Sequence, residues 1–310
     1  MSNPVLAEVV RSGFVESVHR GALVITGPEG SVRLALGDVV SPVYPRSSNK
    51  PLQAVGMLRA GLDFTGEDLA LACASHSGEP GHVKRVLELL DAAGLHEEDL
   101  ACPPDFPLHL PSMRDAAEPR RVMMNCSGKH TAMLTTCVRA GWPVAGYSAP
   151  DHPLQRSLAQ VVSSLTGEPI AHTGVDGCGA PLFAFSLTGL ARAFGRVASA
   201  ASGPATAVAS AMRAHPWLVA GTGREDTALM SGVEGLLAKA GAEGVQAFAL
   251  PDGFAVAMKM DDGAKRACAP LAVSALRYLG VDVTQLEELE RPTVPGGGRP
   301  VGEIRVPELR

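Results

Sequence analysis

Segments with strand character lie at both ends of the chain, and segments with helical character lie between them. Near the start, residues 18–25 and 32–36 are short apolar runs around a Gly-Pro-Glu-Gly turn, which predicts a β-hairpin. Near the end, residues 245–250 and 254–260 flank a Pro-Asp-Gly turn in the same way. Terminal strands of this kind complete one sheet, so we expect a single α+β domain over residues 1–310.

The helical segments are predicted from apolar residues at helical spacing and from capping residues. They cover residues 49–62, 82–93, 127–137, 154–165, 187–198, 205–214 and 271–279. The proline-rich stretch 102–119 predicts an ordered loop. The glycine-rich stretch 295–298 predicts a loop able to flex over a site.

Composition narrows the possible partners. With 46% apolar residues the chain has ample material for a core, and its net charge of −5 without a Lys/Arg run argues against nucleic acid or an anionic membrane. A small molecule is the better expectation. No signal peptide or membrane-spanning helix is predicted, so we expect a cytoplasmic protein. Six irregularly spaced cysteines do not suggest a disulfide scaffold, so the thiols should be reduced and mostly buried.

Residues 46–50 read RSSNK and contain a Ser-x-x-Lys pattern. On a helix, positions i and i+3 share a face, so the Lys50 amine can reach the Ser47 hydroxyl. A serine needs such a base to become a nucleophile, and lysine serves only when burial or a neighbouring cation such as Arg46 keeps it neutral. The alternative interpretation is structural: Ser47 or Ser48 caps the helix that follows.

A second polar corner, residues 125–130 (NCSGKH), precedes a predicted helix, and a glycine-rich loop carries Cys178 beside Asp176. The thiolates of Cys126 and Cys178, one nitrogen from Lys129 and a water would suit zinc. Two unrelated cysteines are the structural alternative. A catalytic alternative, Cys126 as nucleophile with His130 as base, lacks an evident orienting partner.

Two further residues are singled out by their surroundings. Lys259 lies between two methionines in an apolar strand, where it is either a guard residue on an edge strand or a buried base. His76 is flanked by Ser75 and Ser77, whereas the other histidines stand in turns or at helix ends. We therefore keep both Lys259 and His76 as candidate site residues.

Taken together, these patterns resemble the asparaginase II family, the Rhizobium-type or class 3 L-asparaginases. The resemblance extends over nearly the whole chain, and its motifs occur in the family's order. They are 46–50 (RSSNK), 75–79 (SHSGE), 125–130 (NCSGKH), 151–153 (DHP), 176–178 (DGC) and 258–263 (MKMDDG). The resemblance implies a fold like that of serine β-lactamases and glutaminases: an antiparallel sheet packed with helices, with a helical region set between its strands.

When the family's functional residues are placed on the matching positions of this sequence, the resemblance implies two Ser-Lys pairs, a zinc site and a set of neighbouring side chains. The pairs are Ser47 with Lys50 and Ser75 with Lys259. The zinc ligands are Cys126, Lys129 and Cys178. The expected substrate-binding residues are Arg46, His76, His130 and Asp176.

The implied reaction is hydrolysis of the side-chain amide of L-asparagine to L-aspartate and ammonia by a homodimeric enzyme. Neutral Lys50 would accept the Ser47 proton while Lys259 and Ser75 relay protons, or the two pairs would exchange roles. A serine-dependent glutaminase or a penicillin-recognising hydrolase is an alternative, although Ser-Asp-Asn and Lys-Thr-Gly motifs are absent. A non-catalytic zinc-binding protein is a third possibility, which leaves two Ser-Lys pairs without purpose.

Overall fold

The computed structural model describes residues 2–309. Its main sheet has eight strands, all paired antiparallel, in the order β10–β11–β1–β2–β9–β8–β7, with β3 paired to β2 beside this path. The strands of this sheet are β1 (Val5–Arg11), β2 (Phe14–Thr26), β3 (Val32–Leu36), β7 (Leu237–Ala240), β8 (Val245–Ala249), β9 (Ala255–Met260), β10 (Val294–Gly296) and β11 (Arg299–Arg305). Strands from both ends of the sequence thus share one sheet, as predicted.

Strand β2 pairs with strands from both ends of the sequence. Its first half pairs with β1, and its second half pairs with β9 on one side and β3 on the other. The hairpin predicted at residues 18–36 is confirmed, although β2 begins earlier than expected and β1 was not predicted. The predicted hairpin of residues 245–260 is confirmed as β8 and β9.

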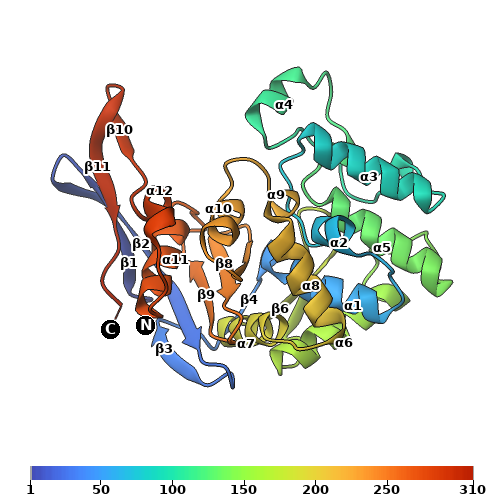
Figure 1. Ribbon diagram of the computed structural model, residues 1–310, viewed down its shortest axis with the longest axis horizontal. Helices are drawn as coiled ribbons and strands as arrows, with labels where there is room; N and C mark the ends of the chain where they lie inside the picture. The colour runs from blue at the N-terminus through green and yellow to red at the C-terminus, as the bar shows by residue number, and fades with distance from the viewer. Residues whose placement is uncertain (1, 310) are drawn as a thin grey trace.

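The segment between β3 and β7 is largely helical and forms the right-hand side of Figure 1. A small antiparallel sheet, β4–β6–β5, lies within it. Its elements are β4 (Pro42–Val43), α1 (Lys50–Arg59), α2 (Gly66–Ala72), α3 (Pro80–Ala92), α4 (Leu110–Asp115), α5 (Ser127–Ala140), α6 (Pro153–Thr166), β5 (His172–Val175), β6 (Pro181–Ser186), α7 (Leu187–Ala198), α8 (Gly203–Ala214), α9 (Pro216–Val219) and α10 (Glu225–Gly232). The predicted α+β fold with a helical region between its strands is therefore confirmed.

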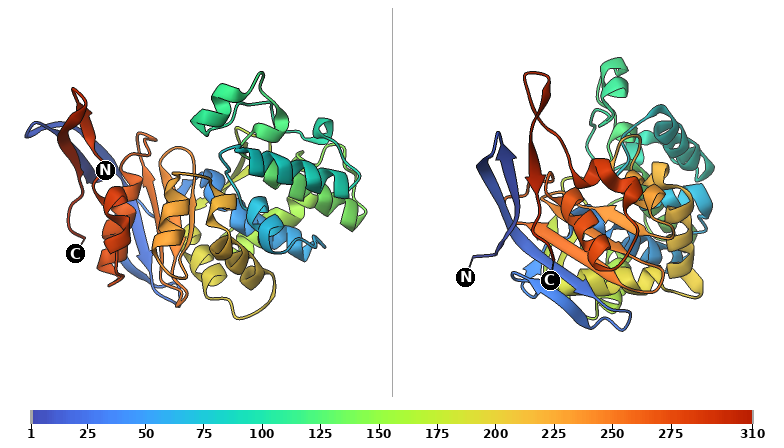
Figure 2. Two further views of the ribbon diagram at one scale, coloured as in Figure 1. Left: turned by 45° about the horizontal axis from the view of Figure 1, so that its top comes forward. Right: turned by 60° about the vertical axis from the view of Figure 1, so that its left-hand side comes forward.

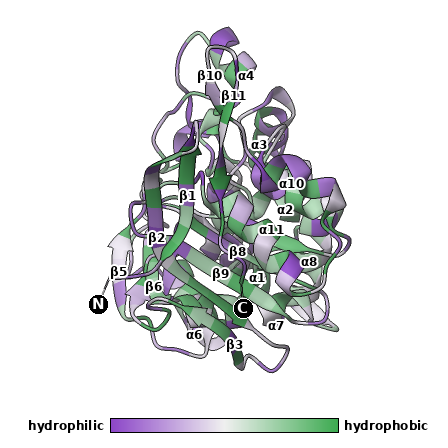
Figure 3. Cartoon of the chain, turned by 90° about the vertical axis from the view of Figure 1, so that its left-hand side faces the viewer, coloured by the Kyte–Doolittle hydropathy of each residue, from purple (hydrophilic) through white to green (hydrophobic). Residues whose placement is uncertain are grey.

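Helices cover the sheet. Helix α7 packs against β2, β8 and β9, and α11 (Cys268–Tyr278), followed by α12 (Glu287–Glu290), packs against β8 and β9. Figure 2 shows α11 on the outer side of the sheet, away from the helical region. Strands β8 and β9 are coloured mainly as hydrophobic in Figure 3, and most of their side chains are buried. The core thus runs through the sheet into the helical region.

Local details differ from the sequence expectations at two helix starts. Helix α1 is preceded by a 3-10 turn, Arg46–Asn49, and neither Ser47 nor Ser48 caps it; the Ser48 hydroxyl instead donates to the Lys239 carbonyl at 2.8 Å. The helix predicted over residues 127–137 is α5, but its capping residue, Cys126, makes no side-chain cap hydrogen bond. The stretch 102–119 contains the short helix α4, and the stretch 295–298 comprises the end of β10 and the two-residue turn to β11.

No helix within residues 2–309 is long and apolar enough to cross a membrane. All six cysteines are free and buried, which confirms the expectation of reduced thiols.

Candidate active site

Lys50 is the centre of a buried polar cluster. Its side chain projects from the first turn of α1 and is only 1% exposed. The amine donates to three acceptors: Ser75 Oγ at 2.9 Å, Cys126 Sγ at 3.1 Å and the carbonyl of Ala74. Three acceptors match the three donors of an ammonium group, so Lys50 must lose one of these protons before it can serve as a base.

Ser75 reaches Lys50 because its segment is held on both sides. The amide of Ser75 donates to the carbonyl of Val219 at 3.0 Å, and the next amide, that of His76, donates to the carbonyl of Asn125 at 3.1 Å. The predicted pairing of Ser47 with Lys50 is not a hydrogen bond here. Ser47 lies in the turn just before α1, and its hydroxyl has no hydrogen-bond partner within residues 2–309.

Close packing of α5 against α2 brings the second corner to the first. A Cβ added at Gly128 would lie 2.6 Å from the carbonyl oxygen of Leu71, so this approach requires glycine. Cys126 stands just before α5, and Ser75 follows soon after the end of α2. The glycine therefore allows the thiol and the serine to contact the same lysine.

Cys126 and Cys178 form a thiol pair beside Lys129. The contact between the two sulfurs and burial raise the pKa of Cys126, whose thiol donates to Asn125 Oδ1 at 3.0 Å. The same contact, together with Lys129, lowers the pKa of Cys178 despite its burial. The Cys178 sulfur accepts from Lys129 Nζ at 3.2 Å.

Lys129 is fully enclosed with these sulfurs. Burial by itself would lower its pKa, but the neighbouring Cys178, Cys126 and Asp176 outweigh burial and raise the pKa. The raised pKa favours the ammonium form of Lys129. It would have to release a proton before it could bind a metal ion.

The three zinc donors predicted from the sequence, Cys126, Cys178 and Lys129, lie together in the structure. Within residues 2–309 no group of three or more His, Cys, Asp or Glu side chains is placed to hold a metal ion. The predicted set has only two thiols, with a lysine amine as the third donor. These three side chains do converge, and sulfur with nitrogen is the donor chemistry that zinc prefers.

His130 is buried beside this set. Its Nδ1 lies 2.7 Å from the hydroxyl of Tyr147, and burial lowers the pKa of the imidazole although the nearby Cys178 sulfur opposes that shift. The orienting partner that the sequence did not reveal for His130 is therefore Tyr147. Nothing in the sequence marks this tyrosine, because it lies 17 residues away in a loop.

His76 is fully enclosed and uses both ring nitrogens within the protein. Nδ1 accepts from the amide of Gly78 at 3.1 Å, so the Nε2 proton points to Ser127 Oγ at 2.9 Å. The ring stacks on His82, which stacks on Trp217. Burial lowers the pKa of His76 well below its usual value. A substrate could bind either nitrogen only by displacing one of these bonds.

Arg46 and Asp176 come together at the rim of the cluster. Arg46 Nε donates to Asp176 Oδ1 at 2.8 Å, and the two side chains are 22% and 12% exposed. Arg46 adopts a left-handed backbone conformation, with φ of 53°, which costs a non-glycine residue about 1–2 kcal/mol. The structure thus holds a strained arginine next to Ser47, with its guanidinium turned toward the Asp176 loop.

Lys259 does not lie with Ser75. Its amine donates to the carbonyls of Glu243 at 2.9 Å and Met260 at 3.0 Å, and the side chain is partly exposed. The predicted Ser75–Lys259 pair therefore does not form, because Lys50 is the amine that contacts Ser75. Lys259 therefore matches neither interpretation, because β9 is an internal strand between β2 and β8 and the side chain is only partly buried.

A third buried lysine near the cluster is Lys239 on β7, which the sequence analysis did not single out. It is 1% exposed and pairs with Asp226 at 3.0 Å. Burial lowers the pKa of Lys239 to about 8, although Asp226 raises it. Lys239 also stands between apolar residues of a strand, so the criterion applied to Lys259 could have found it.

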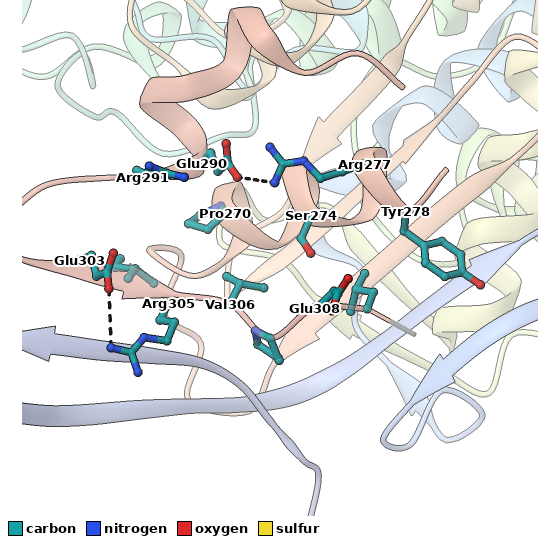
Figure 4. Close-up of a pocket in the computed structure, with 13 residues that line it drawn as sticks. Pro270, Ser274, Arg277, Tyr278, Glu290, Arg291, Glu303, Arg305, Val306 and Glu308 are labelled. Carbon is teal, nitrogen blue, oxygen red and sulfur yellow. Dashed lines mark hydrogen bonds and ion pairs between the residues drawn. The ribbon is translucent and has the colours of Figure 1, made fainter. Parts of the chain in front are cut away.

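A cavity of about 530 Å³ lies far from these residues in the sequence, between α11 and the tail that follows β11. Figure 4 shows Arg277 paired with Glu290 there, and Glu303 paired with Arg305. Its lining contains none of the predicted site residues. The candidate active site therefore remains the cluster around Lys50.

Comparison with known proteins now identifies the family. Residues 7–306 match the family described as L-asparaginase II. The chain belongs to this family. Membership implies a hydrolase that acts on amides and takes a small-molecule substrate. A comparison with curated protein sequences gives no match.

Among solved structures, the chain is similar to Mglu in its native form, with 15% identity and a TM-score of 0.47 over 84% of this chain and 65% of Mglu. The chain thus spans less than two thirds of the length of Mglu. It is also similar to a β-lactamase, Mb2281c, from Mycobacterium bovis, with 16% identity and a TM-score of 0.44 over 83% of this chain and 94% of that one. A third similar structure is EstCE1, a hydrolase with promiscuous acyltransferase activity, with 13% identity and a TM-score of 0.42 over 87% of this chain and 93% of EstCE1.

Proposed function

We propose that this member of the L-asparaginase II family hydrolyses the side-chain amide of L-asparagine to L-aspartate and ammonia. The observation that carries the proposal is the buried contact of 2.9 Å between Lys50 Nζ and Ser75 Oγ. A serine hydroxyl bonded to a lysine amine is the arrangement by which an enzyme activates an oxygen nucleophile. Family membership supplies the amide as the group attacked.

The proposed chemistry begins with proton transfer to neutral Lys50. Ser75 is the hydroxyl within its reach, so Ser75 either attacks the amide carbon or passes the proton of Ser47, which then attacks. The resulting tetrahedral oxyanion needs donors, and we assign this role to the backbone N–H groups of Gly128 and Lys129 in the first turn of α5, beside Cys126, a neighbour of Lys50. Protonated Lys50 then returns its proton to the leaving ammonia, and water releases aspartate.

The charged ends of the substrate require partners of opposite sign. We assign the α-carboxylate to Arg46 and the α-amino group to Asp176, the two residues that the structure pairs at the rim. Bound substrate would replace this ion pair with two new ones. Because the pair is only partly buried, opening it costs little compared with opening a fully buried one.

We also propose zinc as a bound metal, with Cys126, Cys178 and Lys129 as its ligands. Zinc would supply a Lewis acid next to the site when bound. The three side chains must all be deprotonated to bind it, so affinity should fall as the pH falls.

The experiment that tests the function is ammonia release from L-asparagine and L-glutamine, measured side by side with and without a chelator. Turnover of asparagine well above glutamine supports the proposal. Preference for glutamine would make the protein a glutaminase, and release from neither substrate would refute the assignment. Loss of activity only after chelation would show that the metal is required.

A further inference from the structure

Glu243 is a second carboxylate beside Arg46. It lies in the turn between β7 and β8, and its Oε1 is 3.8 Å from Arg46 Nη1. The Nε of the same guanidinium donates to Asp176. The Glu243 side chain is 63% exposed, so this carboxylate is open to solvent at the rim of the candidate active site. Neither the sequence motifs nor the proposed reaction gives Glu243 a role.

The turn between β7 and β8 packs directly on the turn before α1. A Cβ added at Gly241 would lie 2.5 Å from the carbonyl oxygen of Pro45, so the two turns meet at a distance that requires glycine. The hydroxyl of Ser48 also donates to the carbonyl of Lys239, at the β7 side of this turn. These contacts fix the backbone that carries Glu243 against the backbone that carries the rim arginine.

Both members of the ion pair have a left-handed backbone. Among residues 2–309, three residues other than glycine have a positive φ: Ser12, Arg46 at 53° and Glu243 at 58°. Such a conformation costs stability in any residue with a Cβ, whereas an exposed ion pair stabilises a fold only slightly. Stability therefore does not explain why two of these three strained residues meet at one place. Backbone strain is concentrated at ligand-binding and catalytic sites.

The charges of the three rim side chains do not cancel. One guanidinium and two carboxylates give the rim a net charge of −1. A ligand with a carboxylate alone would occupy the guanidinium and add a third negative charge next to the other two, and like charges repel. An α-amino acid also brings an ammonium group, which becomes the new partner of the two rim carboxylates. The rim therefore matches a zwitterion better than a simple anion.

We propose that Glu243 is a specificity-determining residue that receives the α-ammonium group of the substrate together with Asp176. It selects L-asparagine over succinamate, which is the same amide without its α-amino group. The inference deepens the proposed function and rests on it for the reaction, while the selectivity rests on the charges at the rim.

The test is the ratio of kcat/KM for L-asparagine to kcat/KM for succinamate. Exposed charge contacts typically change binding by about two- to fivefold, so Glu243→Gln should lower the asparagine value, raise the succinamate value and reduce the ratio by about tenfold. The change should lie in KM and not in kcat, because this contact is the same in bound substrate and transition state. Glu29→Gln, which removes an equal charge from an exposed glutamate in the turn between β2 and β3, should leave the ratio unchanged.

Glu243→Asp separates charge from shape. Aspartate keeps the charge on a shorter side chain, whereas glutamine keeps the shape without the charge, so the aspartate variant should retain most of the preference for asparagine. A ratio in Glu243→Gln equal to that of the unaltered protein would overturn the proposal. So would the absence of any preference for asparagine over succinamate in the unaltered protein.

Equilibrium binding of L-aspartate and succinate, measured by calorimetry, makes the same comparison without turnover. If no ammonia is released from asparagine but Glu243→Gln still lowers the preference for L-aspartate over succinate, the proposed function fails and the role of Glu243 stands. If ammonia is released and this preference is unchanged in Glu243→Gln, the role of Glu243 fails and the proposed function stands. Binding of neither ligand, with no release of ammonia, would overturn both.

Discussion

Lys239 on β7 and Lys259 on β9 are separated in the sheet by the single strand β8, yet their surroundings differ completely. Each stands between apolar residues in the sequence. Lys239 is buried and pairs with Asp226, whereas Lys259 is partly exposed and donates only to backbone carbonyls. The difference arises because α10 and the turn before α1 pack against β7. Burial of a strand lysine is thus set by segments distant in the sequence.

The contrast between buried and exposed lysines also distinguishes the cluster around Lys50. Three lysines of this cluster, Lys50, Lys129 and Lys239, are 2% exposed or less. Each is enclosed with a specific partner: Ser75 and Cys126 for Lys50, Cys178 for Lys129 and Asp226 for Lys239. A buried cation is costly, so such groups persist where they serve structure or chemistry.

The largest effect is expected at Lys50. Replacing it with methionine removes the base that contacts Ser75, and kcat for asparagine should fall by about 10²- to 10⁴-fold. The matched change at the exposed lysine, Lys259→Met, should leave kcat nearly unchanged. Steady-state ammonia release checks both. Equal losses in the two variants would remove the distinction between the buried and the exposed lysine.

The next effect concerns stability. Lys239→Met leaves Asp226 as a buried charge without its cation, which should cost about 3–5 kcal/mol of unfolding free energy. Lys259→Met removes only two bonds to backbone carbonyls at a partly exposed site and should change stability by about 0.5 kcal/mol or less. Denaturant unfolding measures both. A small loss in the Lys239 variant would show that the buried pair contributes little.

Two neighbouring serines allow the comparison to be sharpened. Ser75 accepts from Lys50, whereas Ser77 is also buried but its hydroxyl donates only to the carbonyl of Ala220. Ser75→Ala should lower kcat by about a hundredfold, while Ser77→Ala should mainly cost about 1 kcal/mol of stability. If Ser77→Ala lost as much activity as Ser75→Ala, the loss would reflect the shape of the segment and not proton transfer.

The smallest effect is a pH dependence. Lysine in the unfolded chain has a pKa of about 10.4, whereas burial lowers the pKa of folded Lys239 to about 8. Between these values the unfolded state binds more protons, so this residue makes the protein more stable as the pH rises from 8 toward 10. The melting temperature of the unaltered protein minus that of Lys239→Met should therefore increase as the pH rises across this range. A constant difference would contradict the lowered pKa.

The sequence was informative where signals are local or carried by motifs. The two hairpins, most helices and the convergence of Cys126, Lys129 and Cys178 follow from apolar spacing and from family resemblance. Pairings made by tertiary packing were not predictable in this way. The resemblance pairs Ser75 with Lys259, whereas Lys50 contacts Ser75 in the structure, and no pattern in a single sequence shows which amine meets which hydroxyl.

Tyr147 and Lys239 illustrate what is missed. Tyr147 contacts His130 across a loop whose path depends on the packing of α6, and no spacing rule connects the two residues. Lys239 and Lys259 both have apolar flanks, so the flanks alone do not distinguish the buried lysine from the exposed one. In both cases the decisive quantity is burial, which arises only when segments far apart in the chain meet.

The central claim, that a serine activated by Lys50 forms an acyl intermediate with asparagine, is tested most directly by trapping with hydroxylamine. An acyl-enzyme would pass its aspartyl group to hydroxylamine, so the hydroxamate should form at the expense of aspartate while ammonia release continues. Lys50→Met and the double variant Ser47→Ala/Ser75→Ala should form neither product at a significant rate. Release of aspartate by the double variant at the rate of the unaltered protein would contradict the account.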